Sequence, residues 1–149
     1  MITLLQRVRC ATVHVEDKAV ATITKGILAY IAIQPDDDAK TTERVAQRIA
    51  GYRIFSDQDG KMNLCVSDID GAILAVPQFT LAADTQKGRR PSFSHTALPD
   101  DAQRLFDTFV TQLRTYHKNV VCGQFQANMQ VESINDGPAT FILSSRTAS

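Results

Sequence analysis

The sequence has few of the residues that build metal centres and disulfide frameworks. Its 149 residues include no tryptophan, three cysteines and three histidines. The cysteines are odd in number and far apart, and no Cys-x-x-Cys or His-x-x-x-His pair is present to seed a zinc site. We therefore expect Cys10, Cys65 and Cys122 to be small buried side chains, and we expect neither a metal nor any other cofactor.

Long hydrophobic runs are also missing. No segment approaches the roughly 18 consecutive apolar residues that a membrane-spanning helix requires, so we expect no membrane partner. The segment from Met1 to Arg7 has its basic residue after the apolar ones and no small-residue cleavage site behind it, unlike a secretory signal. We therefore expect a cytoplasmic protein.

Net charge is absent as well, because 16 basic residues balance 16 acidic ones. The field of the whole protein thus gives no sign of a nucleic-acid partner, which would have to be held by a local patch of cations. The length suits one domain with its own hydrophobic core. We expect a single domain over residues 1–145 and a frayed polar tail over residues 146–149.

What the sequence does contain is a series of short apolar segments and two amphipathic ones. The latter predict helices, one beginning near Asp38 and one at Pro99. Strands dominate, and their order is not the regular strand–helix alternation of a doubly wound fold. We therefore predict an α/β protein of the α+β type, with a curved, barrel-like mixed sheet covered by two main helices. The expected strands are 2–15, 19–23, 26–33, 54–55, 61–66, 72–76, 120–122, 129–134 and 140–143, and the expected helices are 38–52 and 99–118.

Polar residues directly follow one buried strand, at Gln78, Phe79 and Thr80. The Thr80 hydroxyl is a possible nucleophile, but a neutral threonine needs a base beside it and none is visible nearby. A positioning hydroxyl is the alternative role. The backbone N–H groups of these three residues, once released from the sheet ladder, can also point at an oxyanion.

A basic loop comes next, with Lys87, Arg89 and Arg90 among glycine and proline residues. These side chains can bind phosphate, arginine through a two-pronged contact and lysine as a point charge. A solvated basic loop is the alternative. Phe93 and Phe125 are either core residues, which we favour, or platforms on which a base stacks.

The segment 135–140, Asn-Asp-Gly-Pro-Ala-Thr, is a strong turn signal between apolar stretches. Its simplest interpretation is a tight hairpin turn. Pro138 has a fixed φ and Gly137 can take backbone angles closed to other residues, so this pair can also aim two rigid carbonyls.

Three motifs together carry a resemblance, namely residues 78–81 (Gln-Phe-Thr-Leu), 87–93 (Lys-Gly-Arg-Arg-Pro-Ser-Phe) and 135–140. In this order they resemble the D-aminoacyl-tRNA deacylases, and the resemblance runs from Met1 to about Ser145. It implies the fold of that family and a homodimeric hydrolase with active sites at the subunit interface. Such an enzyme cleaves the ester of D-aminoacyl-tRNA, and of glycyl-tRNA mischarged on tRNA(Ala), as a chiral proofreading step of translation.

The resemblance also implies roles for individual residues. The Gly137–Pro138 peptide would be cis and would reach into the partner subunit's pocket, where it rejects L-aminoacyl groups. The Phe79 N–H would stabilise the oxyanion. Gln78 and Thr80 would be catalytic together with Phe79. Substrate binding and chiral selection would also involve Arg7, Phe125 and Met129. The acceptor end of the tRNA would be bound by Lys87, Arg89 and Arg90.

Two positions depart from the family pattern. Pro77 stands where the family usually has serine, which removes a hydroxyl and an N–H at the pocket rim, and Gln126 stands where glycine is common. Two other functions stay open: a module that binds RNA or another partner without turnover, and an esterase for small acyl esters. The attacking group also stays open among water, the ribose 2′-hydroxyl and Thr80.

Overall fold

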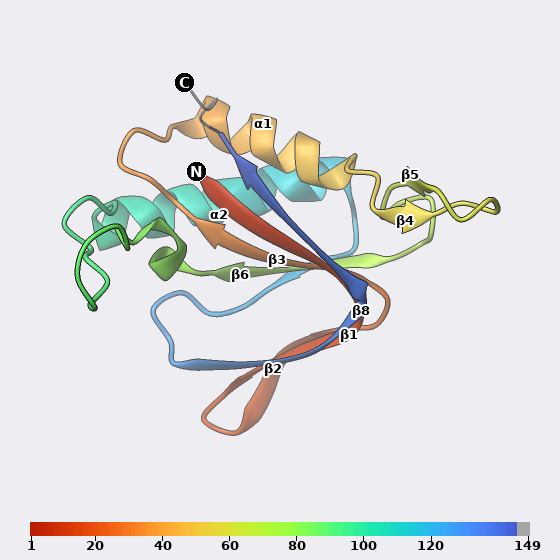
Figure 1. Cartoon of the computed structure of the whole chain (residues 1–149), viewed down its shortest axis with the longest axis horizontal. Helices are drawn as coiled ribbons and strands as arrows, with labels where there is room; N and C mark the ends of the chain where they lie inside the picture. Colours follow the sequence, from red (N-terminus) through yellow and green to blue (C-terminus); the bar gives the residue numbers. More distant parts are fainter. Residues whose placement is uncertain (146–149) are drawn as a thin grey trace.

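The computed structural model describes residues 1–145 and consists of a strongly bent mixed sheet with two α-helices packed on one side (Figure 1). The frayed tail predicted for residues 146–149 lies outside this range. No helix within it is long and apolar enough to cross a membrane. The elements are β1 (Ile2–Val15), β2 (Lys18–Ile23), β3 (Gly26–Ala32), α1 (Ala39–Ala50), β4 (Phe55–Ser56), β5 (Met62–Leu64), β6 (Ala72–Pro77), the 3₁₀ helix η1 (Phe79–Ala82), α2 (Pro99–Tyr116), β7 (Val120–Cys122) and β8 (Met129–Ser144).

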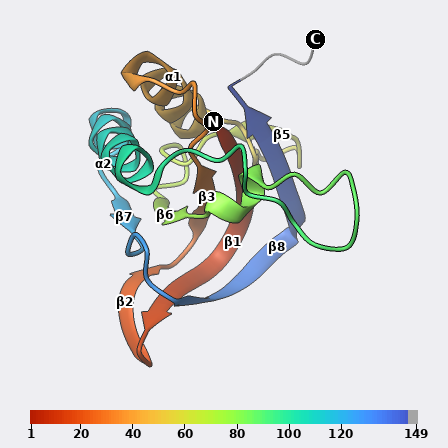
Figure 2. The ribbon, with the colours of Figure 1, turned by 90° about the vertical axis from the view of Figure 1, so that its left-hand side faces the viewer.

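The sheet is organised around the long strand β1. Its strand order is β2-β1-β3-β6-β7, and β8 pairs with β1 in the antiparallel sense from end to end. On its other edge β1 pairs with β3 over Ile2–Val8 and then with β2 over Ala11–Val15. Because one strand serves two partners in succession, the sheet curls over itself, as Figure 2 shows. The α+β class and the barrel-like mixed sheet are confirmed.

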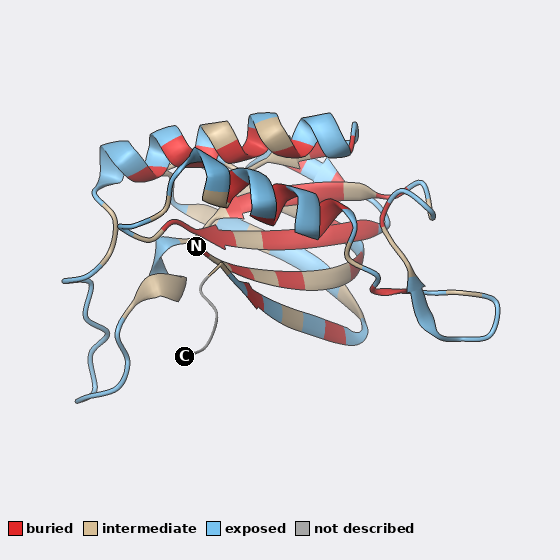
Figure 3. Ribbon diagram, turned by 90° about the horizontal axis from the view of Figure 1, so that it is seen from above, coloured by how far each residue is buried: buried red, intermediate tan, exposed pale blue. Residues whose placement is uncertain are grey.

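Strands β3 and β6 form the centre of the fold and pair in parallel. Ile27 and Ile31 of β3 belong to the core between sheet and helices, whereas Leu28 belongs to a second core inside the curl of the sheet. The continuous apolar run of this segment predicted a strand covered on both faces, and that prediction is confirmed. Both strands are buried along most of their length, and Figure 3 shows the buried residues of the sheet concentrated in the strands beneath the helices.

The two helices begin where the sequence predicted. Asp38 caps α1 by accepting a hydrogen bond from the Thr41 N–H at 2.8 Å, and Pro99 occupies the first turn of α2. Each helix buries one face against the sheet, including Ile49 of α1 and Phe109 of α2. Together these faces close one side of the larger core.

The tight hairpin turn predicted for residues 135–140 is wrong, because the structure has a bulge there. Asn135 pairs with Val8 and Thr140 with Gln6, so residues 136–139 bulge opposite a single β1 residue, Arg7. The two flanking apolar stretches do not pair with each other as a hairpin would, because both pair with β1 as parts of β8. The chain therefore makes a bulge inside one long strand rather than a reversal of direction.

The expectation of three buried cysteines is also corrected. Cys10 is exposed, and Cys65 and Cys122 are only partly buried; all three are free thiols. The pairing of β1 with β8 shifts register between Val8 and Cys10, so Arg9 and Cys10 both face solvent. Simple alternation along the strand does not hold across such an irregularity.

Candidate active site

A cavity of about 590 Å³ opens at the carboxyl ends of β3 and β6. Its walls are apolar, with Ile31 and Val76 from the strands and Phe106 from α2. Amide side chains from Gln78, Gln126 and Asn128 supply polar groups to its lining. A largely apolar cavity with a few polar groups is the usual form of a small-molecule site, and this volume lies within the usual range.

No acidic, basic, histidine or cysteine side chain lines this cavity among the described residues. The chemistry available inside it therefore rests on amide groups, the Thr96 hydroxyl, which donates to the Phe93 carbonyl at 2.9 Å, backbone N–H groups and whatever the substrate itself brings. Elsewhere in residues 1–145, no three histidine, cysteine or acidic side chains group together as metal ligands would. His117 is buried, and both of its ring nitrogens form hydrogen bonds away from the cavity: Nδ1 with the Ser67 hydroxyl at 3.0 Å and Nε2 with the Gly71 carbonyl at 2.9 Å.

The backbone N–H groups of the strand-end motif differ in whether the sheet takes them up. The Gln78 N–H donates to the Ile31 carbonyl at 2.8 Å, so the ladder between β3 and β6 extends one residue further than we expected. Among residues 1–145 the Phe79 N–H has no acceptor. Of the three predicted oxyanion donors, the Gln78 N–H is thus occupied, and those of Phe79 and Thr80 have no acceptor within residues 1–145. Since Phe79 lines the cavity and Thr80 does not, the Phe79 N–H is the one available to bind an oxyanion there.

The Thr80 hydroxyl accepts a hydrogen bond from the Gln78 side-chain amide. Thr80 is exposed and does not line the cavity. An amide cannot accept a proton as a general base does, so this contact positions the hydroxyl without activating it. His95, the nearest histidine in sequence, lies exposed on the loop that follows.

Arg7 holds the backbone around the β8 bulge. Its Nε donates to the Asp136 carbonyl at 2.9 Å, and its Nη1 donates to the Ile54 carbonyl at 2.9 Å. The carbonyl that it binds is therefore the one that precedes the Gly137–Pro138 pair. The peptide bond of that pair is cis, and both residues are exposed on the surface of β8.

The predicted site residues form three groups in the structure rather than one. Only the first group lines the cavity; the second lies on β1 and β8, and the third lies on the exposed loop after η1. The cavity group is Gln78, Phe79, Phe125 and Met129, the second group is Arg7, Gly137 and Pro138, and the loop group is Lys87, Arg89 and Arg90, with Thr80 beside the cavity mouth.

Several cavity residues were missed from the sequence. Thr96 and Ala97 precede α2, and Ala102 and Phe106 lie on its buried face. Helical spacing marked Ala102 and Phe106 only as core, and nothing in that pattern distinguishes a core contact from a cavity wall. Asn128, just before β8, belongs to a segment that shares the family resemblance, but it was given no role of its own.

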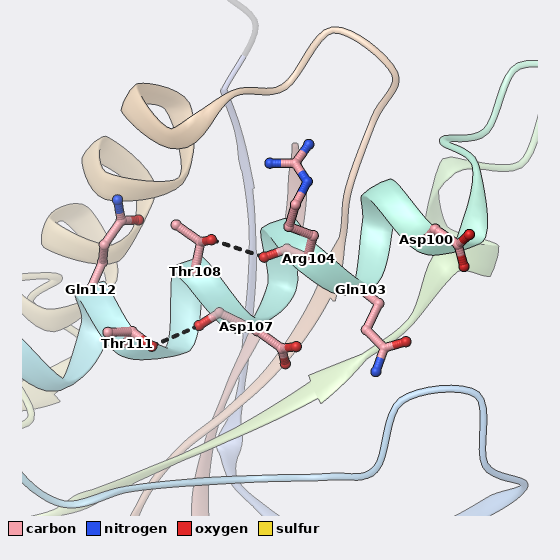
Figure 4. Close-up of a pocket in the computed structure, with 7 residues that line it drawn as sticks. All are labelled: Asp100, Gln103, Arg104, Asp107, Thr108, Thr111 and Gln112. Carbon is pink, nitrogen blue, oxygen red and sulfur yellow. Dashed lines mark hydrogen bonds between the residues drawn. The ribbon is translucent and has the colours of Figure 1, made fainter.

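A second depression, of about 650 Å³, lies on the outer face of α2 (Figure 4). All of its lining residues come from this one helix. Two of the hydroxyls, Thr108 and Thr111, donate to carbonyls of the preceding turn at 2.9 Å. A surface built from one side of a single helix cannot surround a ligand, so we place the active site in the cavity at the strand ends.

Gln126 lies in the left-handed backbone region with φ 58°, a conformation that favours glycine. We expect Gln126→Gly to raise the free energy of unfolding by up to about 1 kcal/mol, because glycine removes this strain. Urea denaturation of the two proteins would measure the change. A clear loss of stability would mean that the Gln126 side chain makes a stabilising contact that outweighs its strained backbone.

Known proteins similar to this chain identify its family. A sequence model of the family described as D-Tyr-tRNA(Tyr) deacylase matches residues 4–144. A D-aminoacyl-tRNA deacylase of Saccharophagus degradans is 50% identical over 143 residues, covering 96% of this chain and 99% of the relative. One of Salmonella agona is 52% identical over 143 residues, with the same coverage.

Solved structures extend the comparison to the fold. A structure titled c-Myc DNA Unwinding Element Binding Protein superposes with a TM-score of 0.93 at 35% identity, covering 99% of this chain and 100% of that one. A probable eukaryotic D-amino acid tRNA deacylase superposes with a TM-score of 0.85 at 18% identity, covering 95% and 97%.

The class of protein defined by these findings is a hydrolase of ester bonds. The chain belongs to the D-Tyr-tRNA(Tyr) deacylase family, which includes the D-aminoacyl-tRNA deacylases named above.

Proposed function

We propose that this protein hydrolyses the ester that joins a D-amino acid to the terminal ribose of tRNA. The observation that carries the proposal is the cavity at the strand ends, which has no ionisable lining side chain but lies beside the free N–H of Phe79. An ester is already activated for attack, so it needs positioning and oxyanion stabilisation more than it needs a strong base. Membership of the deacylase family supports the same reaction.

In this mechanism a hydroxyl oxygen from water, or first from the neighbouring ribose hydroxyl, attacks the ester carbonyl carbon. The carbonyl oxygen becomes an oxyanion and accepts a hydrogen bond from the Phe79 N–H. If water attacks, its proton passes to the ribose oxygen as the carbon–oxygen bond to the ribose breaks, which releases free D-amino acid and tRNA. If the neighbouring ribose hydroxyl attacks first, the same steps move the aminoacyl group onto that hydroxyl's oxygen, and water then attacks this second ester to release the products. Gln78 and Thr80 hold the geometry of the strand end.

Chiral selection is assigned to the Gly137–Pro138 pair of a second copy of the chain. Three observations support this arrangement: the pair does not line the cavity of its own chain, it is exposed, and its backbone is held through Arg7. Ile134 and Ile142, also on β8, are 55% and 71% exposed and supply apolar surface for a homodimer interface. The carbonyls of Gly137 and Pro138 would block the side chain of an L-aminoacyl group and accept hydrogen bonds from the substrate ammonium.

Such a filter works by exclusion and so has a defined limit. Glycine has no side chain to exclude, so glycyl-tRNA, including that mischarged on tRNA(Ala), is a substrate in this proposal.

Lys87, Arg89 and Arg90 contact the acceptor end of the tRNA. Because these contacts to phosphate are few, binding should depend only weakly on salt. Since aminoacyl-tRNA is the proposed substrate, we expect the enzyme to act in the cytoplasm, in translation quality control.

The test is the hydrolysis rate of D-tyrosyl-tRNA, L-tyrosyl-tRNA and glycyl-tRNA by the purified protein. We expect the D and glycyl esters to be cleaved and the L ester to be cleaved at least about a thousandfold more slowly, a difference of roughly 4 kcal/mol. Thr80→Ala should still hydrolyse the D ester, at a rate lowered only by the loss of the contact with Gln78, because the Thr80 hydroxyl has no base beside it and is not the nucleophile. Equal rates on the D and L esters would overturn the chiral filter.

A second function is favoured by one specific finding, the 35% identity to a protein titled as a DNA-unwinding-element binding protein. A nucleic-acid-binding module would bind single strands or tRNA without cleaving any ester. The same assay separates the two functions, since tRNA binding with no hydrolysis supports the module. Cleavage of short activated esters with no preference for the tRNA body would instead support an esterase of small acyl groups.

A further inference from the structure

Two phenylalanines form an exposed aromatic pair at the rim of the cavity. The rings of Phe79 and Phe93 have centroids 5.3 Å apart and are tilted by 54°. Phe79 is 59% exposed and Phe93 is 39% exposed, so the expectation that Phe93 belongs to the core is wrong. Phe79 lines the cavity whereas Phe93 does not, so the pair extends from the cavity outward.

The pair continues into the basic loop. Asp84 and Ser92 exchange two backbone hydrogen bonds of 2.9 Å, which close the base of this loop one residue before Phe93. Lys87, Arg89 and Arg90 are all exposed, and none of them forms an ion pair within the described part of the chain. Three cations without acidic partners therefore lie in the loop that the aromatic pair joins to the cavity.

We infer that this surface, Phe79 and Phe93 with the loop cations, binds the unpaired nucleotides that precede the terminal adenosine of the tRNA. The inference rests on the proposed function, which puts the terminal ribose in the cavity. A strand leaving the cavity mouth would pass over the aromatic pair, where a base can stack, before its phosphates reach the loop. Aromatic platforms beside cations are the usual design of single-strand binding sites, and stacking tolerates any base.

The charge of the surface favours nucleic acid over a second copy of the chain. A partner surface would have to bring acidic groups to three cations within four positions, whereas a nucleic-acid strand carries a phosphate at every nucleotide. Exposed aromatic rings at the base of the loop that carries these cations suit bases, which present a flat face at each step. A homodimer contact at this surface is thus the alternative that the experiment must detect.

The experiment compares two substrates that differ only in the nucleotides upstream of the ester. D-tyrosyl-tRNA carries them, and D-tyrosyl-adenosine does not. We expect Phe93→Ala to raise KM for D-tyrosyl-tRNA roughly tenfold with little change in kcat, and to leave KM and kcat for D-tyrosyl-adenosine as in the unmodified protein. Phe93→Tyr, which keeps an aromatic face, should restore KM. Met62→Ala is the matched control, since Met62 is 46% exposed on the β4–β5 hairpin, at the far end of the molecule from the loop (Figure 1).

Each outcome has a distinct meaning. Equal effects of Phe93→Ala on both substrates, or no effect on either, would overturn the inference while leaving the proposed function intact. A lower molecular mass of Phe93→Ala by light scattering would assign the surface to contact between copies and also overturn it. If the unmodified protein cleaves neither substrate, the proposed function itself has failed, and the inference falls with it.

Discussion

Replacing Gly137 with alanine is expected to lower kcat/KM for D-tyrosyl-tRNA at least about a hundredfold. Gly137 has φ 133°, which an L side chain rarely adopts, and a Cβ atom there would lie 2.8 Å from Nη2 of Arg7. The guanidinium or the bulge has to move. A shift of about 1 Å in a group that positions a substrate can cost two orders of magnitude in rate. Steady-state hydrolysis of D-tyrosyl-tRNA measures the effect.

The matched control is Gly60→Ala. Gly60 also has a positive φ, 78°, but a Cβ atom there would meet nothing within 4 Å. Both variants place a Cβ atom at a positive φ, but 133° lies much further than 78° from the left-handed region that L residues can occupy. Gly60→Ala therefore controls for the replacement of a glycine at positive φ, while the greater strain, the contact with Arg7 and the place in the β8 bulge are specific to Gly137→Ala. Circular dichroism should show both variants folded. If Gly137→Ala and Gly60→Ala have the same activity, the bulge has no role in hydrolysis and the assignment of chiral selection to it is wrong.

Replacing Gly26 with alanine is expected to have the largest effect on stability. Gly26 pairs with Ala72 where β3 and β6 run in parallel, and a Cβ atom there would lie 1.9 Å from the Ala72 carbonyl oxygen. That oxygen belongs to backbone and cannot rotate away, so the two central strands must separate. We expect the free energy of unfolding to fall by about 3 kcal/mol or more, which lowers Tm by roughly 10 °C in a protein of this size.

Gly51→Ala serves as the control for this change. A Cβ atom at Gly51 would lie 3.5 Å from the Gln47 carbonyl oxygen, an ordinary contact, and its φ of −94° is open to any residue. We expect its Tm to stay close to that of the unmodified protein in a thermal melt. A stable Gly26→Ala variant would mean that β3 and β6 can separate at this point without loss of the core.

The elements that depend on local chemistry were predictable from the sequence. The carboxylate of Asp38 and the proline at position 99 mark helix starts, because capping and a fixed φ act within one turn. The continuous apolar run from Gly26 predicted a strand buried on both faces, and both cores contain its side chains. The three motifs that carry the family resemblance were equally visible, since they are contiguous in the sequence.

Features that depend on which strand lies beside which were not predictable in this way. A turn signal such as that of residues 135–140 describes a local bend, but only the pairing of both flanking stretches with β1 made it a bulge. The exposure of Cys10 follows from the same irregular pairing. Phe93 is apolar and so was expected in the core, yet it lies on a loop that the core does not reach.

The sequence by itself determined the helices, the central strands and the family. Only the tertiary structure decided which polar groups are available for chemistry. Gln78 and Phe79 are neighbours, yet the Ile31 carbonyl takes up the N–H of Gln78 and leaves that of Phe79 free. The reason is that successive N–H groups along β6 point to opposite neighbours: those of Ala72 and Gln78 donate toward β3, whereas that of Ile73 donates toward β7. The N–H of Phe79 falls on the side of β7, and β7 ends at Cys122, before any of its carbonyls could reach that N–H. A backbone donor is available only where its neighbouring strand stops, and that is a property of two distant segments together.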